Sequence, residues 1–291
     1  MASRTVKRQH PAYRDDIADL STIRPLPGPD LDQIDPFLFL NHHGPQVYPA
    51  RNHGLPFGPH PHRGFETVTF ILEGDLAHLD SGGGESIIHA GGVQWMTAGR
   101  GLVHAEVSPA EFKQKGGPLE ILQLWVNLPS RLKMVDPHYI GLQKADIPEI
   151  AEDDGRVIVN LISGSWNGRQ APIQSLIDIH MVTLHFTPGG RVRVPVTLGR
   201  NVFLYVVRGQ VNVGGIDAEP CHLIELNDDG DVVEMMASSA ATTDAIVLFG
   251  HAEPIGEPVI AHGPFVMNTR DEIRQAMADY QAGTFGGLPR M

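Results

Sequence analysis

The chain contains one β-rich segment twice, and this internal repeat limits the folds that it can adopt. Residues 60–76 align without gaps with residues 195–211. In both copies a run of β-branched and aromatic residues ends at a glycine turn, at Gly74 in the first copy and at Gly209 in the second. Such a run followed by such a turn is typical of a β-strand. Two similar β domains in tandem are therefore predicted.

Short apolar runs between glycine turns extend this pattern through the first half of the chain. Strands are predicted at residues 67–72, 75–80, 85–89, 93–96 and 119–129. Their close spacing, together with 32 glycines and 23 prolines spread along the chain, predicts an all-β sandwich or barrel. Residues 271–283 are the exception, because their apolar residues recur at helical spacing behind the possible N-caps Asn268 and Thr269. We expect this short helix to pack on a barrel.

The charge balance of the 291 residues excludes one class of partner. Lys and Arg number 22 against 34 Asp and Glu, for a formal net charge of −12. Non-specific binding to a phosphate backbone requires a positive surface. We therefore expect no direct nucleic-acid binding, while contact with a DNA-binding protein remains open.

Cysteine use and hydropathy indicate the compartment. Cys221 is the single cysteine, so an intramolecular disulfide and a thiolate metal cage are both excluded. The first ten residues lack the apolar run of a secretion signal. No stretch approaches the ~18 apolar residues of a membrane span. A cytoplasmic protein without membrane contact is expected.

Histidines in and after the first copy of the repeat suggest a metal site. His60 and His62 share one face of a strand, because side chains alternate with period two, and their Cα atoms lie about 6–7 Å apart. That spacing lets both imidazoles bind one ion. His104 and Glu106 share a face in the same way further along the chain. Three imidazoles and one carboxylate predict a divalent transition-metal site with open coordination positions.

The second copy of the repeat lacks these ligand types. If the strand that carries His60 continues, Glu66 lies on the same face. The aligned positions of the second copy hold a proline, a threonine and an asparagine, namely Pro195, Thr197 and Asn201. This register therefore predicts two barrels, of which only the first holds a metal.

Other side chains in these motifs have structural interpretations. Trp95 and Met96 are expected in the core rather than in a substrate wall. Three histidines in predicted loops are expected at the surface, namely His42, His43 and His53.

Five longer motifs surround the candidate ligands, at residues 60–68, 94–101, 104–106, 124–128 and 264–269. Together they resemble the pirin family of the cupin superfamily over nearly the whole chain. The resemblance implies two cupin jelly-roll β-barrels in tandem, with a metal, usually iron, in the N-terminal barrel only. It implies that four side chains bind the metal, namely His60, His62, His104 and Glu106. Glu66 would then orient a ligand histidine without binding the ion.

The expected domain organisation follows from the repeat and the resemblance. Residues 1–135 would form the N-terminal metal-binding barrel, and residues 136–165 a connecting segment. Residues 166–291 would form the metal-free C-terminal barrel with its closing helix.

The resemblance also implies an activity. Pirins are similar in site to quercetin 2,3-dioxygenase, so the chain is expected to open a flavonol or a related aromatic hydroxy-ketone with O2, releasing carbon monoxide. The ion would lower the pKa of the substrate hydroxyl, and Glu106 is the expected general base. Iron(II) is the expected ion, and manganese, copper, nickel and zinc also suit this donor set.

Two other functions stay open at this point. Eukaryotic pirins act as co-regulators of transcription factors, so the alternative is a metal-containing regulatory or redox-sensing protein that binds a protein partner without turnover. Because one cupin site supports many reactions, an isomerase or other chemistry on a small acid is the third.

Overall fold

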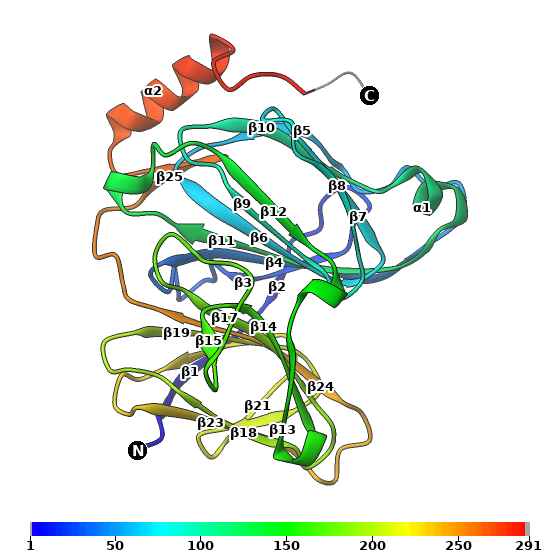
Figure 1. The fold of residues 1–291 in the computed structure, drawn as a ribbon, viewed down its shortest axis with the longest axis vertical. Helices are drawn as coiled ribbons and strands as arrows, with labels where there is room; N and C mark the ends of the chain where they lie inside the picture. Colours follow the sequence, from blue (N-terminus) through cyan, green and yellow to red (C-terminus); the bar gives the residue numbers. More distant parts are fainter. Residues whose placement is uncertain (1, 289–291) are drawn as a thin grey trace. The chain divides into compact units, whose positions relative to one another are not determined.

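In the computed structural model, which describes residues 2–288, two units of β-strands repeat one topology (Figure 1). One unit comprises the residues up to Tyr13 together with Arg24–Pro36 and Asp146–Pro254. The other comprises Arg14–Ile23, Phe37–Ala145 and the chain from Ile255 onward. This second unit contains the candidate metal ligands, and we call it the histidine unit; the first is called the C-terminal barrel.

The histidine unit is built on two antiparallel sheets. The smaller has the strand order β5 (Phe57–His62), β10 (Leu102–Val107), β7 (Asp75–Asp80), β8 (Glu85–His89). The larger has the order β12 (His138–Leu142), β9 (Val93–Thr97), β6 (Phe65–Glu73), β11 (Gly117–Asn127), β4 (Phe37–Tyr48), β3 (Thr22–Leu26), β2 (Tyr13–Arg14). The strands predicted from residue 67 to residue 129 are therefore all present.

The C-terminal barrel has two sheets with matching order. Its smaller sheet runs β18 (Arg191–Pro195), β23 (Val232–Ala237), β20 (Val211–Val213), β21 (Ile216–Ala218). Its larger sheet runs β1 (Val6–Pro11), β22 (His222–Leu226), β19 (Asn201–Arg208), β24 (Ala245–Ala252), β17 (His180–Phe186), β14 (Val157–Ser163), β13 (Glu149–Glu152). In both sheets the order of neighbouring strands matches that of the histidine unit, strand by strand. The tandem all-β fold predicted from the repeat is confirmed.

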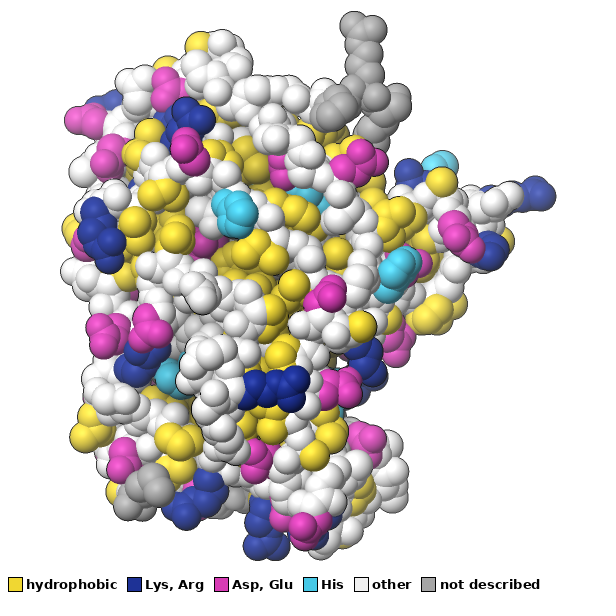
Figure 2. All heavy atoms as spheres, in the orientation of Figure 1, with side chains coloured by type: hydrophobic (Ala, Val, Ile, Leu, Met, Phe, Trp, Pro, Cys, Tyr) yellow, Lys and Arg dark blue, Asp and Glu magenta, His cyan; other side chains and the backbone are white. Residues whose placement is uncertain are grey.

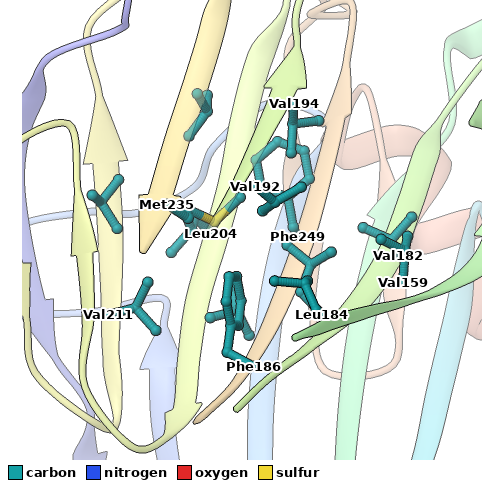
Figure 3. Packing of buried hydrophobic residues seen from close by; sticks show 14 of the residues in the cluster. Val159, Val182, Leu184, Phe186, Val192, Val194, Leu204, Val211, Met235 and Phe249 are labelled. Atoms are coloured by element: carbon teal, nitrogen blue, oxygen red, sulfur yellow. The ribbon is translucent and has the colours of Figure 1, made fainter. Parts of the chain in front are cut away.

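Period-two alternation creates the core of the C-terminal barrel (Figure 3). In β18, Val192 and Val194 are buried while the arginines between and beside them are exposed. Phe186, Leu204 and Phe249 from three strands of the larger sheet pack in the same cluster and are fully buried. Burial of apolar side chains of this size contributes roughly 1.5–3 kcal/mol each. The inward row of each strand thus holds the two sheets together.

The remaining elements are short. They are the hairpins β15 (Ser165–Trp166) with β16 (Arg169–Gln170) and β25 (Ile260–His262) with β26 (Phe265–Met267), the helices α1 (Ala110–Lys115) and α2 (Arg270–Gln281), and 3-10 turns at Ser130–Leu132, Lys144–Asp146 and Asp153–Gly155. The side chain of Thr269 accepts a hydrogen bond from the backbone N–H of Glu272 and completes a capping box at the start of α2. The predicted helix and one of its two predicted caps are confirmed.

The compact units differ from the expected domain boundaries at both ends of the chain. Helix α2 packs beside β25 and β26 and belongs to the histidine unit, not to the C-terminal barrel (Figure 1). At the other end, β1 pairs with β22 and so belongs to the C-terminal barrel. The segment expected to be only a connection supplies β12 to one large sheet and β13 to the other. Backbone pairing with a sheet edge decides these placements, and it leaves little trace in local hydropathy.

The surface agrees with the acidic composition. Figure 2 shows Lys and Arg side chains scattered among Asp and Glu on the face drawn, without a basic patch there. Among the described residues, no helix has the length and apolarity to cross a membrane.

Candidate metal centre

Three histidines from two neighbouring strands converge in the histidine unit. Strands β5 and β10 are antiparallel neighbours, and their register places His104 directly opposite His60. The ring centroids are 4.3 Å apart for His60 and His104, 4.9 Å for His62 and His104, and 4.8 Å for His60 and His62. One nitrogen from each ring lies within 4.8 Å of the others. The group could hold a metal ion, as the sequence spacing predicts.

Hydrogen bonds leave particular nitrogens of these rings available. Nδ1 of His60 lies 2.8 Å from the carbonyl oxygen of Gly58, and Nδ1 of His62 lies 3.3 Å from that of Pro264. Each Nδ1–H can donate to its carbonyl, which leaves the Nε2 lone pair free for an ion. Neither ring nitrogen of His104 has a hydrogen-bond partner among the described residues, although the side chain is completely buried. An ion bound by His104 would remove the cost of that unsatisfied group.

Burial keeps the imidazoles of His62 and His104 neutral. Desolvation, aided by nearby His60, lowers the pKa of His62 to about 3. Desolvation, with smaller contributions from the neighbouring histidines, lowers the pKa of His104 well below its usual value. A neutral imidazole offers a lone pair to a cation, so the chemistry of this donor set fits a transition metal.

Glu106 lies on the same strand but outside the group of convergent ligand atoms. A β-bulge separates it from His104 in the pairing of β10 with β5. Its carboxylate is buried and accepts hydrogen bonds from Thr69 Oγ1 at 3.0 Å and from Gln123 Nε2 at 2.5 Å. The structure therefore assembles three of the four expected ligands, and metal binding by Glu106 remains a proposal.

Glu66 lies on a different strand from His60 and His62. The strand that carries His60 ends at His62, and Glu66 lies on β6 in the other sheet, beyond a turn at Gly64 with φ of +89°. The expectation that one strand carries all three side chains on one face is therefore wrong. The buried Glu66 carboxylate accepts a hydrogen bond of 2.6 Å from Thr97 Oγ1, and burial raises its pKa to about 7.

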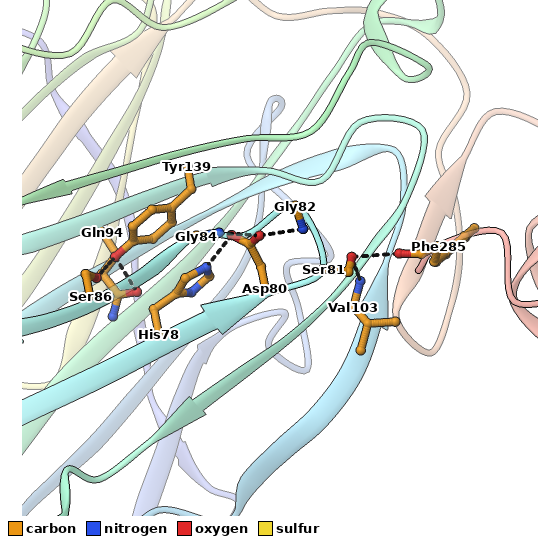
Figure 4. Close-up of polar contacts among 10 residues, drawn as sticks. All are labelled: His78, Asp80, Ser81, Gly82, Gly84, Ser86, Gln94, Val103, Tyr139 and Phe285. Atoms are coloured by element: carbon orange, nitrogen blue, oxygen red, sulfur yellow. Dashed lines mark hydrogen bonds and ion pairs between the residues drawn. The ribbon is translucent and has the colours of Figure 1, made fainter. Parts of the chain in front are cut away.

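His78 is a buried histidine near this group that the motif analysis did not identify. Its ring centroid lies 5.4 Å from that of His104, and its ring stacks on Tyr139 at 3.9 Å. Its Nε2 lies 2.8 Å from Oδ2 of Asp80, which also accepts backbone N–H donors through Oδ1 (Figure 4). The predicted strand contained the signal, because His78 lies two residues after the apolar Leu76 and so shares its inward face.

The C-terminal segment supports the loop that follows His62. Arg63 donates from Nε to the carbonyl of Arg100 at 2.6 Å and forms an ion pair of 2.7 Å with Asp279 of α2. Its guanidinium also lies 4.6 Å from the ring centre of Phe285. The motif before the helix and the helix itself therefore hold the end of the ligand strand in place.

Aromatic side chains adjoin His62. Its ring lies 5.0 Å from the ring of Phe65 and 5.4 Å from that of Trp125, which stacks on Phe39 at 4.7 Å. Nε1 of Trp125 has no hydrogen-bond partner within the described part of the chain. The centre therefore has a flat apolar border with one available donor.

The other expectations for single side chains have mixed outcomes. Trp95 and Met96 are buried, and His53 is exposed, as predicted. The surface prediction for His42 and His43 is wrong, because β4 extends through them and buries both.

Two units of one topology, with an imidazole group at the paired strands β5 and β10 of the histidine unit, define a tandem cupin with a candidate metal site. The family model described as "Pirin" matches residues 19–126, and "Pirin C-terminal cupin domain" matches residues 181–286. The chain belongs to the pirin family.

Individual relatives agree with this assignment. The chain is 39% identical over 265 residues to a pirin-like protein from Solanum lycopersicum, covering 90% of this chain and 86% of the relative. It is 37% identical over 252 residues to a Pseudomonas aeruginosa protein named "Putative quercetin 2,3-dioxygenase", covering 87% of each. A crystal structure of quercetin 2,3-dioxygenase from Acinetobacter baumannii aligns with a TM-score of 0.90 at 32% identity, covering 98% of this chain and 99% of that one.

Proposed function

We propose that the chain is a metal-dependent dioxygenase of the quercetin 2,3-dioxygenase type, which opens a flavonol or a related aromatic hydroxy-ketone with O2. The observation that carries the proposal is the convergence of three imidazoles, one of which, the buried ring of His104, has no hydrogen-bond partner among the described residues. The names of the Pseudomonas and Acinetobacter relatives support the reaction class.

The proposed metal ligands are His60, His62, His104 and Glu106, with iron(II) as the ion. A bound iron(II) would supply Lewis acidity toward the substrate hydroxyl and reactivity toward O2. An imidazole binds an ion in its neutral form, so Glu106 would contribute the single negative charge of the ligand set. Binding of an ion by Glu106 would require its carboxylate to turn from the donors that now hold it, Thr69 and Gln123.

Glu106 is also the proposed general base. The flavonol hydroxyl must lose its proton before the ring can react with O2, and a carboxylate is a suitable acceptor. The hydrogen bonds from Thr69 and Gln123 restrict the position of this carboxylate before the substrate arrives.

The border of the site suits a flat substrate. Trp125, which is partly exposed, lies beside His62, and an aromatic face packs well against a planar ring system. The free Nε1–H of Trp125 can donate to a ketone or hydroxyl oxygen. His60 is the only one of the three histidines that is not fully buried, so substrate would enter from its side.

The test is an anaerobic titration of iron-loaded protein with quercetin, followed by admission of air. We expect the quercetin absorption band to shift on binding and then to bleach only with oxygen. His62→Ala should abolish both changes, while the exposed His89→Ala, in the same unit, should leave them intact. Trp125→Phe should weaken binding without preventing turnover.

The result also separates the proposed enzyme from its alternatives. No shift with iron, manganese, copper, nickel or zinc would contradict the flavonol dioxygenase. It would favour a metal-containing protein that senses redox state or binds a protein partner. A shift without bleaching would indicate binding without turnover.

A further inference from the structure

The C-terminal barrel has a cavity where the histidine unit has its imidazoles. Strands β18 and β23 pair as β5 and β10 do. The pairing of β20 with β23 places Val213 opposite Met235, just as the pairing of β7 with β10 places His78 opposite Glu106. Val233 and its partner Val194 therefore take the places of His104 and His60, and neither can bind a metal. This end of the barrel therefore has no equivalent of the imidazole group.

A cavity of about 850 Å³ lies at this end of the C-terminal barrel, and its lining includes the inward-facing Val194 and Val196. Every lining residue belongs to the C-terminal barrel. Small-molecule sites typically enclose ~300–1,000 Å³. The volume is therefore sufficient for an organic ligand of moderate size.

One wall of the cavity is an aromatic column. The ring of Trp166 stacks on that of His180 at 5.9 Å, and His180 stacks on His251 at 4.8 Å. The column is held in position, because Trp166 Nε1 donates to Glu152 at 2.7 Å and Arg200 Nε donates to Nδ1 of His251 at 2.8 Å. A preformed aromatic wall favours a planar ligand and reduces the entropic cost of binding it.

Two buried polar atoms in the lining residues have no partner among the described residues. They are Nε2 of His180, whose side chain is only 8% exposed, and Oδ1 of Asp231. Burial lowers the pKa of His180 to about 4, so its ring is a neutral imidazole at neutral pH. An unsatisfied buried carboxylate oxygen calls for a hydrogen-bond donor.

The charges around the cavity disfavour an anion. The guanidinium of Arg200 is already engaged by Asp178 and His251, and that of Arg193 is paired with Glu234 at 2.9 Å. Three carboxylates line the cavity against these two guanidinium groups. A ligand that brings a hydroxyl hydrogen fits better than one that brings a carboxylate.

We propose that the C-terminal barrel binds a neutral planar phenol in this cavity. Its ring packs against the column of Trp166, His180 and His251, and its hydroxyl donates to Asp231. The site is independent of the metal centre and of the function proposed above.

The test is calorimetric titration of the full chain carrying His62→Ala, in the presence of a chelator, which disables the candidate metal centre. The probe is 2-naphthol, with 2-methoxynaphthalene as the analogue without a donor and 2-naphthoate as the anion. We expect one site per chain and at least about tenfold weaker binding of both analogues, because each loses the hydrogen bond to the carboxylate. Asp231→Ala, which removes the acceptor, should remove most of the preference for 2-naphthol over its methyl ether.

A matched pair of surface substitutions locates the site. Leu198 is exposed and lines the cavity, so Leu198→Trp should fill it and abolish binding. Leu176 is exposed in the same unit but is not part of the lining, so Leu176→Trp should bind as the parent does. Absence of 2-naphthol binding, tighter binding of 2-naphthoate, or binding that survives Leu198→Trp would each overturn the proposal.

Discussion

The buried carboxyl of Glu66 should make the histidine unit more stable at mildly acidic pH. Burial raises its pKa from 4.5 to about 7, against the opposing hydrogen bonds from Thr97 and Trp95. Between these two values the folded state holds more protons than the unfolded state, so its free energy of unfolding rises as the pH falls. The full effect of the pKa difference is about 3 kcal/mol, most of which lies between pH 8 and pH 5.

The perturbation is Glu66→Gln, which keeps the shape and removes the titration. Urea unfolding of chelator-treated protein at pH 5, 6, 7 and 8 gives the free energy of unfolding at each pH. The chain has three tryptophans, so a Trp166→Phe background leaves fluorescence only from the histidine unit, at Trp95 and Trp125. Other titrating groups cancel in the difference between parent and variant.

We expect that difference to change by about 2–3 kcal/mol in favour of the parent from pH 8 to pH 5. Thr97→Val removes a hydrogen bond that lowers the pKa of Glu66, so it should extend the pH dependence to higher pH. A difference that stays constant from pH 5 to pH 8 would refute the reasoning, since Glu66 would then ionise alike in the folded and unfolded states.

Three further predictions concern backbone geometry, capping and acid stability. Gly64→Ala should lower the free energy of unfolding by at least about 2 kcal/mol, because φ of Gly64 is +89° and an added Cβ would lie 2.1 Å from the carbonyl oxygen of Val266. In the same urea assay Gly58→Ala should be nearly neutral, because an added Cβ there has no neighbour within 4 Å. Thr269→Ala should cost about 1 kcal/mol in thermal unfolding, whereas Thr269→Ser should retain the cap of α2. The free energy of unfolding of the C-terminal barrel should fall as the pH falls from 6.5 to about 4, because the lowered pKa of His180 means that the unfolded state takes up the proton first. His180→Phe should flatten this part of the pH profile of unfolding. An unchanged profile would contradict the prediction.

Local periodicity was sufficient to predict most strands and the helix. Strands β7 and β8 match their predicted bounds, because each is a short alternating run between glycine turns. The helix was found with its cap, since Thr269 and Glu272 form a capping box that is local in sequence. The two histidines of one strand could be predicted in the same way, because alternation along β5 needs no knowledge of other strands.

The sequence by itself thus determined the repeated β pattern, the presence of one histidine-rich copy and the pairing of His60 with His62 on one face. Only the tertiary structure decided what crosses between strands. The register of β5 with β10 brings His104 to the other two imidazoles, while the bulge and the donors around Glu106 hold its carboxylate apart.

The same distinction explains why the sequence does not indicate which unit each end of the chain joins, and why His78 was overlooked. Strand β1 is partly exposed and joins β22 through backbone hydrogen bonds, which every sequence can form, so its partner cannot be inferred from its side chains. His78 approaches His104 across the pairing of β7 with β10, a contact that exists only once the sheet has formed. Periodicity predicts the face on which a side chain lies, and the long-range register of the strands decides which side chains meet.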